Sequence, residues 1–219
     1  MTSNERRVDS KYVIIIRHGE LENPGHISYN RDSIMKSEDV VHLSAQGREQ
    51  MRTLGKLIKQ KGFNVKIILV SPETRGQESA KYLTSVGSFP QIETEEGLDE
   101  IFAPGPYLMG LKTDQIDSLK GNVYEGPQWK SYNHEMPESV AGRMRKVFNG
   151  LVRELKTGES GVLISHGDPI GWLLNDLLTG HLPKPGDLRD SFYPDKGTGF
   201  VVVLNSKNEV KNYYQLVLK

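Results

Sequence analysis

Short apolar runs that alternate with longer amphipathic stretches are the feature that most constrains how this chain can fold. Three such runs occupy residues 12–16, 65–70 and 161–165. They are rich in Val and Ile and too short for helices, which is typical of strands buried on both faces of a parallel sheet. A strand that is buried on both faces needs helices on both sides, so the runs predict an α/β fold.

The stretches between these runs carry helical signals. Ser44 is placed to cap a helix over 45–61, and Ser71 followed by Pro72 predicts a second helix start. Apolar residues at helical spacing predict a long helix over 137–155, and Asp168-Pro169 predicts another reaching about residue 178. Further strands are expected at 91–95, 200–204 and 213–218. The order predicts a three-layer α/β/α sandwich with a mostly parallel central sheet, in one domain over residues 1–219.

Residues 101–136 differ in character from the rest of the chain. This segment is rich in proline, glycine and aromatic residues and interrupts the alternation of strands and helices. We interpret it as an insertion, or cap, over the edge of the sheet, with one short helix near 111–120. Its aromatic residues either line a pocket or form a small satellite core beneath a long loop.

Charge and composition exclude several classes of function. Lys plus Arg and Asp plus Glu each total 28, so the net charge is zero, which argues against nucleic-acid or membrane-surface partners. The chain has no cysteine, which excludes disulfides, thiolate nucleophiles and Cys-ligated zinc. The first seventeen residues hold no apolar stretch of signal-peptide length, so we expect a cytoplasmic protein without a membrane span. The sequence does not indicate an oligomeric state.

Two of the expected strands end in His-Gly, at His18 and His166. Ligands of open α/β sheets gather at the carboxyl ends of the strands, so these histidines are expected to meet there. Arg17 precedes the first histidine, and Arg75 lies in the first turn of the helix that follows the second strand. Glu100 and its neighbour Asp99 follow the expected third strand, and either could act as the acid. The topology therefore predicts histidines, arginines and a carboxylate at one edge.

This set of side chains suits a phosphoryl group. Guanidinium groups bind phosphate oxygens, and the amino end of a helix after Gly167 would add a positive dipole end. A neutral imidazole can attack phosphorus, and neighbouring arginines would lower its pKa. A carboxylic acid can protonate the leaving group and then activate water, so this chemistry calls for no metal ion or cofactor.

Taken one at a time, these residues also have purely structural interpretations. An isolated histidine is most often structural, and Arg75 is at a spacing that permits an ion pair with Glu78 or Glu73. The remaining histidines lack metal-site spacing, although His134-Glu135 borders the insertion and could contact a substrate. Walker-type and Gly-x-Ser-x-Gly motifs are also missing.

Five motifs in the same order resemble the histidine phosphatase superfamily, also called phosphoglycerate mutase-like. They are Arg17-His18-Gly19-Glu20, the helix that begins near Leu43-Ser44, Ser71-Pro72-Glu73-Thr74-Arg75, Pro137-Glu138-Ser139, and Val162-Leu163-Ile164-Ser165-His166-Gly167. The resemblance spans about residues 12–180. A single Arg-His-Gly would be a weak signal, whereas the ordered set is specific.

The resemblance implies a role for each matched position. His18 would be the phosphorylated nucleophile, Arg17, Arg75 and His166 would bind the transferring phosphate, and Glu100 would be the acid and base. The substrate would be a small phosphorylated molecule selected by residues 101–136.

The chain also departs from the family's pattern. Asn23-Pro24 stands where the mutases usually carry Trp-Asn, and His166 is followed by Gly-Asp-Pro rather than Gly-Asn-Ser. We expect Asn23 and Arg31 to reach the pocket, with Asn23 among the phosphate-binding residues. These departures favour a phosphatase, with a phosphoglycerate mutase as the alternative and an inactive phosphate-binding or scaffold protein as the second alternative.

Overall fold

The computed structural model describes residues 9–25, 30–103, 112, 115 and 133–216. Six strands within these residues form one sheet in the order β3-β2-β4-β1-β5-β6. The strands are β1 (Lys11–Arg17), β2 (Val65–Val70), β3 (Ile92–Thr94), β4 (Ser160–Ser165), β5 (Gly199–Leu204) and β6 (Val210–Leu216). β1, β2, β3 and β4 run parallel, whereas β5 and β6 add an antiparallel hairpin beside β1.

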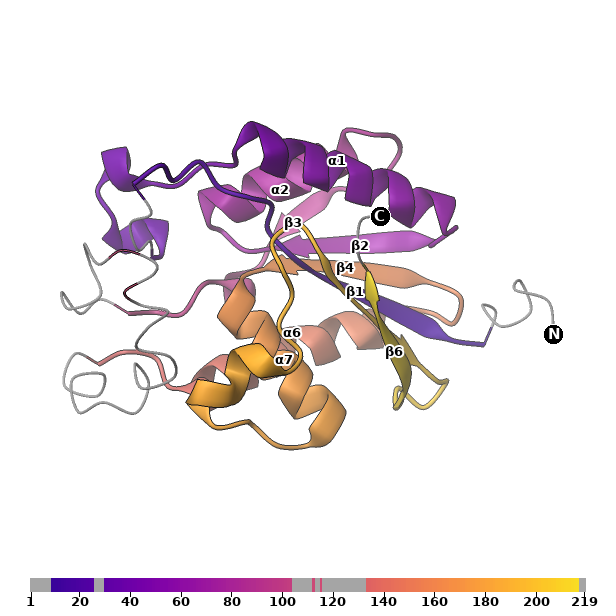
Figure 1. The fold of residues 1–219 in the computed structure, drawn as a ribbon. Coiled ribbons are helices and arrows are strands. Elements are labelled where there is room, and N and C mark those ends of the chain that lie inside the picture. Colours follow the sequence, from indigo (N-terminus) through magenta and orange to yellow (C-terminus); the bar gives the residue numbers. More distant parts are fainter. Residues whose placement is uncertain (1–8, 26–29, 104–111, 113–114, 116–132, 217–219) are drawn as a thin grey trace.

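Helices cover both faces of this sheet (Figure 1). They are α1 (Ala45–Gln60) and α2 (Thr74–Thr84) on one face, and α6 (Pro137–Glu154) and α7 (Gly167–Thr179) on the other. Short 3-10 turns lie at Asp32–Ile34, Ser37–Asp39, Glu96–Leu98 and Pro185–Asp190. The predicted three-layer α/β/α sandwich with a mostly parallel sheet is confirmed.

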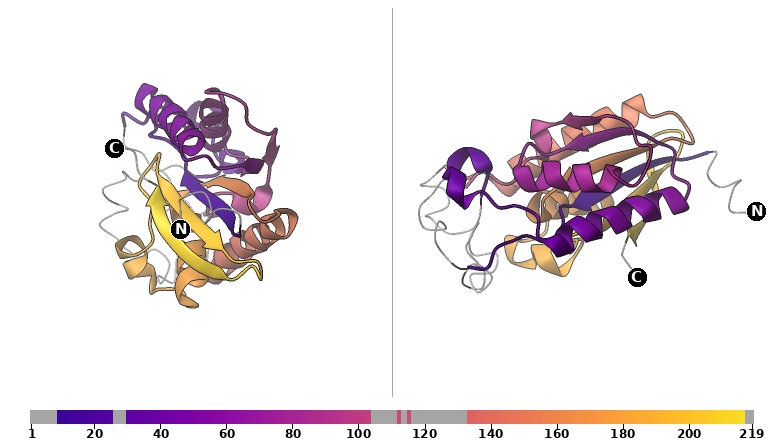
Figure 2. Two further views of the ribbon diagram at one scale, coloured as in Figure 1. Left: turned by 90° about the vertical axis from the view of Figure 1, so that its right-hand side faces the viewer. Right: turned by 90° about the horizontal axis from the view of Figure 1, so that it is seen from above.

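The alternation of side chains along β1 explains the two cores. Val13 and Ile15 face α6 and α7, whereas Ile14 and Ile16 face α1 and α2, and all four are fully buried. Because a strand sends successive side chains to opposite faces, an unbroken apolar run supplies both layers at once. Figure 2 shows these two helical layers from two further directions, with the β5–β6 hairpin (yellow) at one side of the sheet.

Two predicted helix starts are wrong, for a related reason. α2 begins at Thr74 rather than at Pro72, and the Ser71 hydroxyl instead contacts His166 Nε2 at 2.8 Å. α7 begins at Gly167 with His166 as its N-cap residue, while the Asp168 carboxylate accepts a hydrogen bond from Tyr193 at 2.6 Å. In both cases the expected capping side chain bonds elsewhere.

Other boundaries lie close to their predictions. The last strand begins at Val210 rather than at 213, and residues 217–219 lie outside the described residues. The expected helix near 111–120 and most of the insertion at 101–136 likewise lie outside them. Within the described part of the chain, no helix combines the length and apolar character needed to cross a bilayer.

Candidate active site

Sheet register brings the two histidines together. β1 pairs with β4 in parallel, with Arg17 opposite Ser165, so the residues after these two positions are neighbours. The His18 backbone N–H donates to Ser165 O at 3.1 Å, and the ring centroids of His18 and His166 are 5.3 Å apart. Both side chains are buried.

A glycine pair makes room for the loop that follows His18. A Cβ on Gly19 would stand 2.6 Å from Gly47 O, and one on Gly47 would stand 2.0 Å from Glu20 O. The first turn of α1 therefore packs directly against the backbone of this loop, an approach that only glycine permits. The approach fixes the backbone immediately after His18.

The contacts of His18 define its tautomer. Nδ1 lies 2.9 Å from Gly19 O, and because a carbonyl only accepts, Nδ1 carries the proton and Nε2 the lone pair. Burial lowers the pKa of His18 well below its usual value, and the charges of Arg17 and Arg75 lower it further. The sequence attributed this lowering to the arginines, but burial is the larger cause. The imidazole is neutral and holds its free lone pair at Nε2.

His166 is held by a different partner. Its Nε2 pairs with Ser71 Oγ at 2.8 Å, and its Nδ1 faces Glu100 Oε2 at 3.5 Å. Burial, followed by the charge of Arg75, lowers the pKa of His166 well below its usual value. Ser71 was missed as a site residue, although its place at the carboxyl end of β2, beside β4, was a usable signal.

Arg75 is buried among carboxylates. Nη1 lies 3.3 Å from Glu73 Oε2 and 3.6 Å from Asp32 Oδ1, and Nη2 lies 3.5 Å from Glu100 Oε2. It also donates to Asn30 O at 3.1 Å. A fully buried guanidinium needs such partners. These contacts keep the Nη2 atom of Arg75 facing Glu100. The topology predicted that an arginine and a carboxylate would meet at this edge of the sheet.

Arg17 lies at the amino end of α7. Its Nη1 donates to Pro194 O at 3.1 Å, and its guanidinium packs over the Tyr193 ring at 5.2 Å. A Cβ on Gly167 would come within 3.0 Å of Arg17 Cζ, so the guanidinium lies against the first turn of the helix. The helix amino end and this charge together suit an anion.

Asp99 and Glu100 occupy one turn but face different partners. Glu100 Oε2 lies 3.5 Å from both His166 Nδ1 and Arg75 Nη2. Burial raises the pKa of Glu100, and Arg75 only partly offsets it. Asp99 Oδ2 instead pairs with Arg31 Nη1 at 3.3 Å. Of the two carboxylates, Glu100 is the one with contacts to the histidine pair.

Glu73 and Asp99 form a second carboxyl pair, in which Glu73 also contacts Arg75. Burial and a hydrogen bond with Asp99 raise the pKa of Glu73 to about 9, which favours the protonated form of Glu73 at neutral pH. Glu73 Oε2 also accepts from the Asp32 backbone N–H. The sequence prediction left Glu73 without a role in the site.

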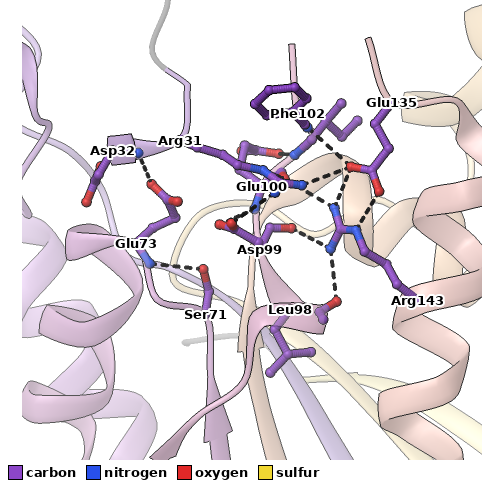
Figure 3. Close-up of polar contacts among 12 residues, drawn as sticks. Arg31, Asp32, Ser71, Glu73, Leu98, Asp99, Glu100, Phe102, Glu135 and Arg143 are labelled. Carbon is purple, nitrogen blue, oxygen red and sulfur yellow. Dashed lines mark hydrogen bonds and ion pairs between the residues drawn. The ribbon is translucent and has the colours of Figure 1, made fainter. Parts of the chain in front are cut away.

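Three further charged residues surround the Glu100 turn (Figure 3). Arg31, which the sequence placed near the pocket, donates through Nε to Glu100 O at 2.6 Å. Glu135 and Arg143 join it. The sequence named Glu135 only with His134, as a possible substrate contact, and it gave no role to Arg143. Asn23 lies half-buried in the loop after β1, and its phosphate-binding role stays a prediction.

A family model and a curated relative match most of this chain. The model of the histidine phosphatase superfamily (branch 1) matches residues 13–190. A protein described as probable phosphoglycerate mutase GpmB, from Yersinia enterocolitica, is 26% identical over 178 residues, covering 76% of this chain and 74% of that protein.

Two solved structures share the fold. Bacillus stearothermophilus YhfR superposes with a TM-score of 0.70 at 18% identity, covering 91% of this chain and 94% of its own. A phosphoserine phosphatase variant from Entamoeba histolytica, in complex with phosphoserine, gives a TM-score of 0.68 at 18% identity, covering 93% and 96%. Because the family model spans most of the chain, this protein belongs to the histidine phosphatase superfamily.

Proposed function

We propose that this chain is a metal-independent phosphomonoester hydrolase that works through a phosphohistidine on His18. The observation that carries the proposal is the state of His18. Its Nδ1–H is fixed on Gly19 O, its pKa is lowered, and its ring lies 5.3 Å from that of His166. A neutral imidazole with its lone pair on Nε2 is a competent nucleophile at neutral pH.

In the first step, His18 Nε2 forms a bond to phosphorus and the bond from phosphorus to the ester oxygen breaks. Glu100 gives its proton to that oxygen, which leaves as an alcohol. The raised pKa of Glu100 keeps a protonated fraction available for this transfer. Arg17, Arg75 and His166 bind the phosphoryl oxygens, over which the charge of the transferring group is spread in a loose transition state.

In the second step, water replaces His18. The Glu100 carboxylate takes a proton from the water, the new oxygen–phosphorus bond forms, and the bond from Nε2 to phosphorus breaks. Inorganic phosphate leaves, and both His18 and Glu100 return to their starting protonation states.

The substrate we propose is a small phosphorylated molecule. The structural neighbour from Entamoeba histolytica holds phosphoserine, which supports this size class. We further propose a single cytoplasmic domain in which residues 101–136 select the substrate. Neutral net charge and the absence of cysteine support the location.

Hydrolysis of p-nitrophenyl phosphate in excess chelator tests the proposal. We expect wild-type turnover to survive the chelator and to fall by roughly 10⁴-fold or more in His18→Ala, because the nucleophile is gone. The half-exposed His42 supplies the matched control, since His42→Ala removes an imidazole away from the site. Turnover that needs a metal, or that survives in His18→Ala, contradicts the proposal.

A phosphoglycerate mutase is the second candidate, because the curated relative carries that description. A mutase keeps its phosphohistidine and returns the group to a substrate hydroxyl. Mixing the phosphoenzyme with 3-phosphoglycerate and quenching the reaction at intervals separates the two activities. Decay to inorganic phosphate supports the hydrolase, and transfer to the acceptor supports the mutase.

A further inference from the structure

Side chains, rather than the sheet, hold the loop that carries Glu100. β3 ends at Thr94, and the residues after the turn Glu96–Leu98 lie outside any strand. Yet four successive carbonyls accept hydrogen bonds from side chains. Gly97 O and Asp99 O accept from Arg143 Nη1 (2.9 and 2.8 Å), Leu98 O from Ser165 Oγ (2.6 Å), and Glu100 O from Arg31 Nε (2.6 Å) and Arg143 Nη2 (3.2 Å). Pairing each carbonyl fixes the path of the backbone.

Glu135 ties the two arginines together. Its Oε1 accepts from Arg143 Nε at 2.7 Å, and its Oε2 accepts from Arg143 Nη2 at 3.1 Å and Arg31 Nη2 at 3.0 Å. Burial alone would raise the pKa of Glu135, but the hydrogen bond and charge of Arg143 outweigh it, so the pKa is lowered. Figure 3 shows Arg143 between Glu135 and the loop carbonyls. We name these three residues the Arg31–Glu135–Arg143 clamp.

The clamp also joins both ends of the segment that the sequence marks as an insertion. The Glu135 backbone N–H donates to Phe102 O at 2.8 Å, and its Oε2 accepts from Phe102 N at 3.2 Å. Arg31 packs over the Phe102 ring at 5.4 Å. The residues just after Glu100 and those just before α6 are therefore fixed by the same ionic group.

The hydrogen bonds and ion pairs of Arg31 and Arg143 reach backbone carbonyls and the carboxylates of Glu135 and Asp99. Arg31 and Arg143 border a cavity of about 600 Å³ whose lining does not include His18, His166 or Glu100. Substituting Arg143 therefore removes no contact made by His18 or by the Glu100 carboxylate. The charge of Arg143 is one of the smaller causes that lower the pKa of His166, so the effect that reports the position of Glu100 is a loss confined to leaving groups that need a proton.

We propose that Arg31, Glu135 and Arg143 are positioning residues that hold Glu100 where it protonates the leaving group. This inference rests on the proposed hydrolase function. Proton transfer needs the acid within hydrogen-bond reach of the ester oxygen, and a displacement of about 1 Å can cost roughly 100-fold. The clamp sets that distance through the backbone of residues 97–100.

Leaving-group dependence tests the proposal, because an alkoxide needs a proton from the acid and dinitrophenolate does not. We compare kcat/KM for glycerol 2-phosphate and 2,4-dinitrophenyl phosphate, since this constant reports the step that releases the alcohol. In Arg143→Met we expect a loss of roughly 30- to 100-fold with glycerol 2-phosphate and less than about fivefold with the dinitrophenyl ester. A purely structural loss would lower both equally.

Arg145→Met is the matched control. Arg145 lies on the same helix and pairs with Asp176 at 2.6 Å, away from the Glu100 loop. We expect both constants to stay near wild type in this variant. A selective loss in Arg143→Met, absent from Arg145→Met, supports the clamp, whereas equal losses for the two substrates in Arg143→Met overturn it.

Two further variants keep the test decisive. If circular dichroism shows that Arg143→Met does not fold, the nearly isosteric Glu135→Gln carries the same prediction. In a Glu100→Gln background, Glu135→Gln should cause no additional selective loss, because its effect passes through Glu100. An additional selective loss overturns the proposal. Wild-type protein without turnover on either ester overturns the hydrolase function itself, and the clamp with it, so the two failures are distinguishable.

Discussion

The two sides of the candidate site are held in place by different means. On the histidine side, His18 and His166 follow directly from paired strands, and parallel register fixes their separation. On the carboxylate side, Glu100 lies in a loop whose carbonyls are held by Arg31, Arg143 and Ser165. Backbone pairing places the proposed nucleophile, and side-chain pairing places the proposed acid.

The two sides also shift proton affinity in opposite directions. Burial lowers the pKa of His18 and of His166, because burial disfavours the cation. Burial raises the pKa of Glu100, because it disfavours the anion. One physical cause therefore favours a neutral base and a neutral acid in the same site, which is the pairing that phosphoryl transfer from an ester requires.

The largest expected effect separates the two sides by their pH dependence. For an alkyl phosphate, kcat/KM should fall on the acid side only well below pH 6.5, where His18 protonates, because its pKa is lowered. On the alkaline side it should fall as pH rises through the raised pKa of Glu100. In Glu100→Gln we expect a loss of roughly 100-fold or more at the optimum and no alkaline fall beyond that caused by ionisation of the substrate.

Steady-state kinetics from pH 4 to 9 on the wild type and on Glu100→Gln give the two pH profiles of kcat/KM. The variant shares the ionisation of the substrate, so the difference between the two profiles isolates the carboxyl group. An alkaline fall that persists unchanged in Glu100→Gln would remove Glu100 from the acid role and bring Asp99 back as the rival.

This contrast explains what the sequence could predict. Unbroken apolar runs predicted the strands, and strand ends in a parallel sheet share an edge, so His18 and His166 could be brought together before any coordinates. The predicted helix starts failed at Ser71 and Asp168, because those side chains bond His166 and Tyr193 instead of the helix. A capping signal depends on neighbouring residues only, so it cannot predict a hydrogen bond to a residue far away in the sequence.

The carboxylate side was less predictable for the same reason. Arg143 lies beside the buried stripe of α6, where an arginine usually reaches solvent, and its bonds to residues 97–100 cross more than forty positions of sequence. The Glu73–Asp99 hydrogen bond likewise joins two loops that only the fold brings together. Pairing between side chains and loop backbone leaves no periodic signal in the sequence.

The second expected effect is on stability. The folded-state pKa of Glu73 is raised to about 9, above its unfolded value of 4.5, so the folded protein keeps a proton that the unfolded chain releases. Its contribution to stability is complete below pH 4.5 and is lost as pH rises toward 9, with a slope of at most about 1.4 kcal/mol per pH unit. We expect Glu73→Gln, which stays neutral, to flatten the fall of the unfolding free energy between pH 5 and 9.

Urea denaturation at several pH values measures how the unfolding free energy changes with pH. Glu93→Gln, at an exposed position on β3, is the control. The control should keep the wild-type slope. If Glu73→Gln and Glu93→Gln give the same slope, Glu73 is ionised in the folded protein and its raised pKa is wrong.

The smallest effect is expected at Ser165, which connects the two sides. It ends β4 beside His166, and its hydroxyl donates to Leu98 O at 2.6 Å in the carboxylate loop. Ser165→Ala leaves that buried carbonyl without this donor, so we expect a loss of about 1–2 kcal/mol in unfolding free energy. Ser160→Ala on the same strand is the matched control, because among the described residues the buried Ser160 hydroxyl has no hydrogen-bond partner. If thermal denaturation shows equal losses for both variants, Ser165 contributes only packing, and the sheet does not support the acid loop through this bond. A loss confined to Ser165→Ala would mean that the strand that places His166 also anchors Glu100.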